Sequence, residues 1–112
     1  MKKIEAIIRT TKFDSVRDAL AQIGVKFFTL KEVKGYGLQK GKVLKYRGSS
    51  YGRDFIARLQ LDIVTTEDKV TEIVDTIIAS GKTGEVGDGK IFVMDIDSIV
   101  RIRNGEIDAS AI

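Results

Sequence analysis

The chain has 112 residues, of which 43% are hydrophobic and 31% charged, and its 19 Lys and Arg against 16 Asp and Glu give a net charge of +3. This length predicts one compact domain over residues 1–112, and no apolar run approaches the roughly 18 residues of a membrane span. Cysteine and histidine are absent, which excludes disulfides, Cys/His zinc sites and histidine-dependent catalytic triads.

The first predicted element is a strand over residues 3–9. Apolar and polar residues alternate there, so Ile4, Ala6 and Ile8 share one face, which is typical of a half-buried strand. Because this pattern begins directly after Met1, no signal peptide fits before it. We therefore expect a cytoplasmic protein.

A helix is predicted next, because apolar residues recur at helical spacing from position 13 to position 23. Thr11 and Asp14 resemble a capping box at its start, and Gly24 stands where a helix usually stops. Residues 25–33, rich in β-branched and aromatic side chains, predict the second strand.

The second half repeats this order. Residues 56–64 alternate cleanly, which predicts a strand with Ala57, Leu59, Leu61 and Ile63 inward. Thr65 or Thr66 is expected to cap a second helix, whose apolar stripe runs from position 70 to position 78 and is ended by Gly81. Residues 91–94 predict the last long strand.

The order βαββαβ predicts an α+β, ferredoxin-like sandwich, in which both helices cover one face of a four-stranded antiparallel sheet. The other face needs cover for Ile7, Phe27, Val64 and either Phe92 or Val93. A homo-oligomer is the natural solution. Residues 35–55, nearly all polar, form an unusually long connection, and such connections are commonly functional.

Two glycine-punctuated segments, residues 34–41 and 83–90, are suited to an anionic ligand, because glycine lets backbone N–H groups converge on phosphate or carboxylate oxygens. Neither is an enzyme motif. Residues 84–90 match GxxxxGK, but Ile91 follows where a P-loop needs Ser or Thr, and a strand follows instead of a helix. Residues 35–41 spell GxGxxxG and lead into a loop, so they match a dinucleotide fingerprint poorly.

Several segments in register along the whole chain resemble the PII family of nitrogen-regulatory signal-transduction proteins. They are MKKIEAII at 1–8, EVKG at 32–35, QKG at 39–41, YRG at 46–48, Tyr51, TG at 83–84, GDGKIFV at 87–93 and IRxGE at 102–106. The resemblance implies a homotrimer with one nucleotide site in each cleft between subunits, where ATP and ADP compete and 2-oxoglutarate joins Mg-ATP. Residues 37–55 would then be the T-loop, which changes conformation with the ligand and docks on partners.

The resemblance also implies the site residues. The nucleotide would be bound by Ile7, Thr29, Gly35, Gly37, Leu38, Gln39, Val64, Gly87, Asp88, Gly89, Lys90, Arg101 and Arg103. Residues 87–90 would hold the phosphates from one side, with Arg101 and Arg103 reaching across from the neighbouring subunit. The 2-oxoglutarate site would comprise Gln39, Lys40, Gly41, Arg58 and Gly87, and Gln39 would help to coordinate Mg²⁺.

Two residues depart from the family pattern. Leu38 stands where many relatives have an arginine that contacts the phosphates, and Arg58 replaces the usual lysine of the 2-oxoglutarate site. Arginine keeps the charge but changes the geometry of the head group. Tyr51 matches a tyrosine that is uridylylated in many relatives, and Ser49 aligns with a serine that is phosphorylated in others.

The resulting hypothesis is a non-enzymatic sensor of ATP, ADP and 2-oxoglutarate. Its T-loop would control ammonium transporters, enzymes of nitrogen metabolism and a uridylyltransferase, with recruitment to the membrane by a transporter. The first alternative is a divergent PII-like nucleotide sensor that responds to a different metabolite, motivated by Leu38 and Arg58. An acylphosphatase-like enzyme fits poorly, because residues 9–12 contain no glycine for a phosphate loop. An RNA-binding sandwich lacks the expected aromatic and basic motif, so we expect no nucleic-acid partner.

Overall fold

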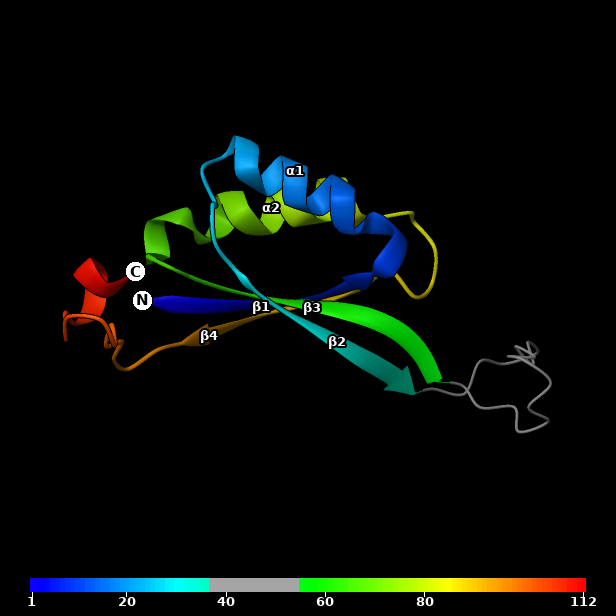
Figure 1. Ribbon diagram of the computed structural model, residues 1–112. Coiled ribbons are helices and arrows are strands. Elements are labelled where there is room, and N and C mark those ends of the chain that lie inside the picture. Colours follow the sequence, from blue (N-terminus) through cyan, green and yellow to red (C-terminus); the bar gives the residue numbers. More distant parts are fainter. Residues whose placement is uncertain (37–54) are drawn as a thin grey trace.

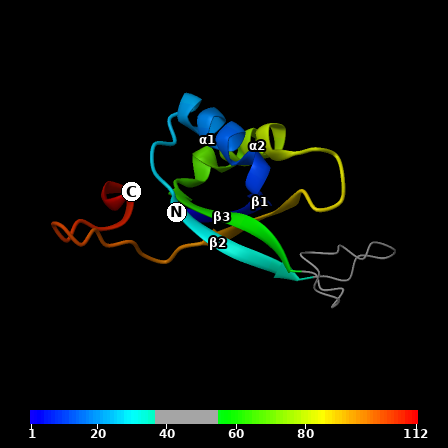
Figure 2. The same ribbon diagram turned by 45° about the vertical axis from the view of Figure 1, so that its right-hand side comes forward.

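The computed structural model describes residues 1–36 and 55–112. Four strands form one antiparallel sheet in the order β2-β3-β1-β4: β1 (Lys2–Arg9), β2 (Thr29–Tyr36), β3 (Phe55–Thr65) and β4 (Gly89–Asp95). Two helices, α1 (Phe13–Gln22) and α2 (Val70–Gly81), lie side by side on one face of this sheet (Figures 1 and 2). The predicted ferredoxin-like α+β sandwich is confirmed.

The hydrophobic core lies between the helices and the sheet. Strand β1 has Ile4, Ala6 and Ile8 on its helix-facing side, all buried as the alternation predicted. The helices and the central strand β3 contribute the remaining buried apolar side chains: Val16, Leu20, Leu61, Ile63, Ile73 and Ile77. Ala57, which was expected inward as well, is exposed because this end of β3 extends beyond the helices.

Both helices begin differently from the prediction. A 3₁₀ turn precedes each of them, η1 (Thr10–Lys12) before α1 and η2 (Glu67–Lys69) before α2. The residue at the N-cap position is Lys12 in α1 and Lys69 in α2, and neither makes a side-chain capping hydrogen bond. The predicted capping box of Thr11 and Asp14 was therefore wrong. Thr66 stands at the N-cap position of η2, as one of the two residues predicted there, but its side chain makes no capping hydrogen bond. The stop after α1 was right, since Gly24 has a φ of +90°.

Strand β2 begins four residues later than predicted. The amide of Val25 donates to the carbonyl of Leu20 at 3.0 Å, which holds the start of the connection against the end of α1. Phe28 then turns inward and meets Phe13 edge to face, with ring centroids 6.2 Å apart. Pairing with β3 starts at Thr29 and continues to Tyr36, opposite Phe55. Gly35 consequently lies in a strand and not in a loop.

The sheet face away from the helices is uncovered within residues 1–36 and 55–112. Register places Val64 opposite Lys3 and Phe92 opposite Glu5 on this face, with Ile7 on the same strand as Lys3. Val64 and Phe92 are both more than one-third exposed. Of the two candidates on β4, Phe92 lies on the open face, while Val93 pairs with the buried Ile4 on the other.

After β4 the chain forms an irregular C-terminal segment beside the N-terminus (Figure 1). A single bridge joins Val100 to Ile107, and Arg101 and Glu106 are linked through a backbone hydrogen bond of 2.8 Å. Arg103 lies within the turn at residues 102–104, and Arg101 directly precedes it. Among the described residues, no helix is long and apolar enough to cross a membrane.

The buried centre of β3 provides a test of this packing. Leu61 is fully buried between the helices and the sheet, so Leu61→Ala should lower the free energy of unfolding by about 3 kcal/mol through lost burial and a residual cavity. Leu61→Met conserves most of the volume and should cost less than about 1.5 kcal/mol. Urea titration followed by circular dichroism measures both. Equal losses would contradict the placement of Leu61.

Candidate functional site

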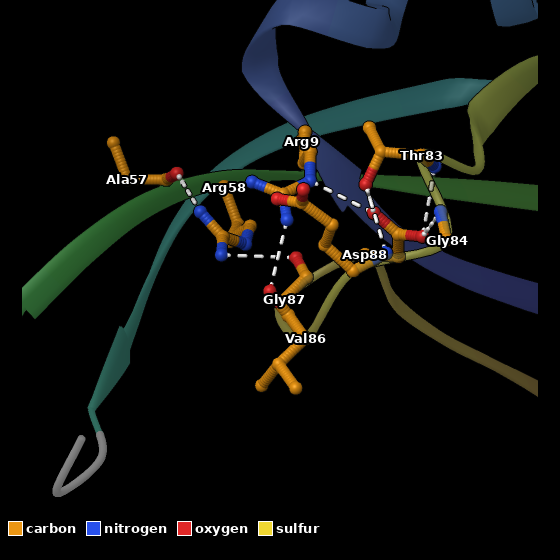
Figure 3. Close-up of polar contacts among 9 residues, drawn as sticks. Arg9, Ala57, Arg58, Thr83, Gly84, Val86, Gly87 and Asp88 are labelled. Carbon is orange, nitrogen blue, oxygen red and sulfur yellow. Dashed lines mark hydrogen bonds and ion pairs between the residues drawn. The ribbon is translucent and has the colours of Figure 1, made fainter. Parts of the chain in front are cut away.

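The connection between α2 and β4 is closed by one carboxylate. Asp88 Oδ2 accepts hydrogen bonds from the backbone amides of Thr83 and Gly84, both at 2.8 Å, and Oδ1 accepts one from the Thr83 hydroxyl at 2.5 Å (Figure 3). Three donors within two consecutive residues thus converge on one side chain. The contact fixes the turn that the glycine-rich sequence makes possible.

Arg9, the last residue of β1, joins this loop to the sheet. Its Nε donates to Asp88 Oδ1 at 2.9 Å and its Nη2 donates to the carbonyl of Val86 at 2.9 Å (Figure 3). The Thr83 hydroxyl first, and then Arg9, hold the pKa of Asp88 well below its usual range. Asp88 therefore remains a carboxylate at neutral pH, occupied by contacts within the protein.

Arg58 approaches the same loop from β3, where it is the cross-strand partner of Arg9. Its Nη2 donates to the carbonyl of Gly87 at 3.0 Å, and its Nη1 donates to the carbonyl of Ala57 at 3.1 Å. Partial burial, and secondarily the charge of Arg9, lower the pKa of Arg58. Two guanidinium groups thus hold consecutive carbonyls of one loop.

The orientation of these carbonyls determines where the next amides point. The described peptide bonds are trans, and in a trans peptide the N–H points opposite to the C=O. Because the carbonyls of Val86 and Gly87 face Arg9 and Arg58, the N–H groups of Gly87 and Asp88 face away from the two arginines. Consecutive amides of this kind can bind an anion.

Gly89, at the start of β4, can only be glycine. Its φ is +108°, and a Cβ built on it would lie 1.8 Å from the carbonyl oxygen of Ile7. The loop therefore enters the sheet by a close approach of two backbones. Gly87, with a φ of +101°, has the two guanidinium groups 3.1 and 3.2 Å from the position of a Cβ.

A cavity of about 500 Å³ adjoins the loop. Seven of the predicted ligand residues line it: Ile7, Gly35, Arg58, Gly87, Asp88, Gly89 and Lys90. Cationic side chains beside oriented amides can hold phosphate or carboxylate oxygens. The structure thus brings together one half of the predicted nucleotide site with Arg58 of the predicted 2-oxoglutarate site.

The other described candidates lie at the opposite end of the sheet. Thr29 and Val64 line a second cavity, of about 440 Å³, together with Ile99 and Ile112. Arg101 lies nearby, since its Nη2 is 3.5 Å from the carbonyl of Ile112. Gly35 lies six positions after Thr29 along β2, which corresponds to about 20 Å. One chain does not bring the two groups together.

The remaining candidates lie outside the described residues. They are Gly37, Leu38, Gln39, Lys40, Gly41 and Tyr51, together with Ser49.

Sequence reasoning missed Arg9 and Thr83. Arg9 ends an alternating strand, where a solvated arginine is unremarkable, and its partners lie 77 and 79 positions away. A signal existed only for Thr83, which precedes a glycine-rich loop that contains a carboxylate five residues on. Such a spacing permits the side chain to close the turn.

The fold and this loop define the class: a ferredoxin-like sandwich whose glycine-rich loop, held by arginines, can bind a small anion. The model of the family described as "Nitrogen regulatory protein P-II" matches residues 1–106. Over all 112 residues and their full lengths, the chain is 52% identical to "Nitrogen regulatory protein P-II" from Klebsiella oxytoca and 51% identical to "Nitrogen regulatory protein P-II 1" from Escherichia coli strain K12. It is 49% identical to "Nitrogen regulatory protein P-II" from a Synechocystis species over the same length.

The chain therefore belongs to the P-II family of nitrogen regulatory proteins. The members are signal-transduction regulators and not enzymes, which confirms both the recognised resemblance and the non-enzymatic prediction.

Two glycines of the loop make a matched comparison. Gly89→Ala places a Cβ against the Ile7 carbonyl and should lower the free energy of unfolding by more than about 3 kcal/mol, because β4 must move from β1. Gly84→Ala has a similar φ, +88°, but no atom within 4 Å, so it should cost only about 1–2 kcal/mol of backbone strain. Urea unfolding and amide exchange of β4 measure the difference. Similar losses would refute the close approach.

The pKa of Asp88 leads to a prediction about acid. Because the folded pKa lies below the unfolded value of about 3.9, the contribution of Asp88 is complete above that value and is lost as the pH falls toward the folded pKa. Asp88→Asn should therefore flatten the stability profile below about pH 4. Carboxyl ¹³C NMR titration should show Asp88 still ionised at pH values where an ordinary aspartate is half protonated, and a normal titration would refute the contact.

Proposed function

We propose that the protein senses ATP, ADP and 2-oxoglutarate and thereby controls partners in nitrogen metabolism. The observation that carries this proposal is the orientation of the 86–88 peptides, whose amides face away from Arg9 and Arg58 beside Lys90. Amides and a lysine together suit the oxygens of a di- or triphosphate. Membership of a regulatory family supports a binding function rather than turnover.

The nucleotide site is proposed to form between subunits of a homotrimer. The two groups of candidates are separated by about 20 Å along β2 in one chain. A neighbouring copy that packs on the open sheet face would supply Thr29, Val64, Arg101 and Arg103 to the loop at residues 87–90. The exposed Val64 and Phe92 on that face favour such packing.

We propose further that 2-oxoglutarate binds beside the nucleotide, with a carboxylate on Arg58. Gln39, Lys40 and Gly41 would complete this site, and Gln39 with the phosphates would hold Mg²⁺. Within residues 1–36 and 55–112 no cluster of three acidic side chains offers a metal site, which agrees with a metal bound through the nucleotide.

One observation favours the alternative sensor of a different metabolite. Arg58 already donates to the carbonyls of Gly87 and Ala57, so a carboxylate must compete with both bonds or use the remaining donors of the guanidinium. The lysine that Arg58 replaces in relatives would have a flexible ammonium group, without the fixed planar arrangement of donors in a guanidinium. The ligand beside the nucleotide could therefore differ in size or in its number of carboxylates.

We propose that partners bind to residues 37–55, the T-loop, of one domain that spans residues 1–112. Occupancy of the site would select T-loop conformations with different affinities for an ammonium transporter, nitrogen-metabolism enzymes or a uridylyltransferase that modifies Tyr51. A transporter partner would recruit an otherwise cytoplasmic protein to the membrane.

Calorimetric titration of ATP and ADP, each with and without Mg²⁺ and 2-oxoglutarate, tests the proposal. Lys90→Gln should weaken both nucleotides about tenfold, because a charged donor to phosphate is lost. Lys34→Gln is the matched control: Lys34 neighbours Gly35 on β2 but faces the other side of the sheet.

The calorimetric outcomes distinguish the sensor of 2-oxoglutarate from the sensor of a different metabolite. Heat from 2-oxoglutarate only in the presence of Mg-ATP supports the nitrogen sensor. Nucleotide binding without a response to 2-oxoglutarate favours the alternative metabolite. No nucleotide binding, or equal affinity in Lys90→Gln, contradicts both.

A further inference from the structure

Arg9 connects two parts of the molecule that are distant in sequence, the end of β1 and the loop at residues 86–88. It ends β1, its Nε holds Asp88 at 2.9 Å, and its Nη2 holds the carbonyl of Val86 at 2.9 Å (Figure 3). The guanidinium is the only side-chain donor to the Val86 carbonyl within the described residues. It does not line the 500 Å³ cavity itself, so its action there is indirect.

The bond to Val86 fixes the plane of one peptide. If the Val86 carbonyl lost this donor, the Val86–Gly87 peptide could rotate, because Gly87 tolerates both signs of φ. A rotated peptide would present its carbonyl oxygen where the Gly87 N–H now points. An oxygen in that position repels an anion that the N–H would attract.

Among residues 1–36 and 55–112, no apolar contact of the loop could replace this bond. Val86 is 93% exposed, and no residue of the 82–88 segment belongs to the hydrophobic core. The orientation of the loop therefore depends on polar contacts to Arg9, Arg58 and Asp88.

We propose that Arg9 is a positioning residue for the anion-binding loop: through the Val86 carbonyl and Asp88 it holds the Gly87 amide in the orientation that receives phosphate. This proposal rests on the proposed nucleotide site and adds a residue that acts without touching the nucleotide. Arg58, in contrast, holds the next carbonyl and lines the cavity directly.

The test is calorimetry with ATP and with ADP in the absence of 2-oxoglutarate, on the full chain. Arg9→Gln should weaken both nucleotides about tenfold, because the ion pair and the carbonyl bond are lost together. Arg9→Lys keeps the charge and one bond, and should recover part of the loss. Arg17→Gln is the matched control, since Arg17 binds Asp14 and Asp18 on α1.

Two readouts separate positioning from general loss of structure. The amide resonance of Gly87 in ¹H–¹⁵N NMR should shift in Arg9→Gln, while buried β1 amides such as Ile4 keep their positions. In an Asp88→Asn background, Arg9→Gln should cost clearly less than tenfold, because the ion pair of Arg9 with Asp88 is already lost.

Failure of the inference is distinct from failure of the proposed function. If the unmodified protein binds no nucleotide, the proposed function itself is wrong. If it binds and Arg9→Gln binds equally well, or if the tenfold loss persists in full in Asp88→Asn, Arg9 does not position the loop through these contacts. Failure of Arg9→Lys to recover any affinity in a folded protein would also overturn the proposal.

Discussion

The ion pair between Arg9 and Asp88 is the contact on which the site depends. It joins the end of β1 to a loop 79 positions later, and it lies at the point where two backbones approach at Gly89. Ordering a polar loop costs conformational entropy, which burial of apolar side chains usually offsets. Here the loop side chain Val86 is exposed, so hydrogen bonds to charged groups take that role. Loop geometry is consequently tied to the sheet rather than to the core.

The open face of the sheet is not a simple apolar surface. Asp62 lies there with its side chain only 9% exposed, and Lys31 and Lys3 approach its carboxylate to 3.2 and 3.9 Å. Burial alone would raise its pKa, but hydrogen bonds from Gln60 and Lys31 lower it overall. A second copy that covers this face, as proposed, therefore meets an ordered charge network as well as Phe92. Such networks restrict register more than they increase stability.

The sequence predicted the elements whose signal is local and periodic. Strand β1 and both helices follow from alternation and from stripes such as Val16 and Leu20, and the open face follows from topology. The start of β2 was missed, because Phe28 packs inward against Phe13 and no local pattern encodes that contact.

The candidate site was also predictable only in part. Glycine spacing indicated residues 87–90, whereas Arg9 is recognised as part of the site only when the fold brings β1 and the loop together. The turn that contains Arg103 was not predicted, because it depends on backbone hydrogen bonds of Arg101 with Gly105 and Glu106.

Net charge alone would give the proposed site little selectivity among anions. Arg9, Arg58 and Lys90 face Asp88 and Glu85 around the loop, which leaves a formal charge of only +1 for a ligand. Asp88 is already occupied by Arg9 and Thr83, and the close approach of a second guanidinium contributes to the lowered pKa of Arg58. An anion that enters would relieve this repulsion between like charges. Because the net charge around the loop is small, the proposed site would discriminate between anions through the direction of its hydrogen-bond donors. That direction is set by the orientation of the 86–88 peptides. In the proposed site, the same contacts that stabilise the loop would thus determine which anion binds.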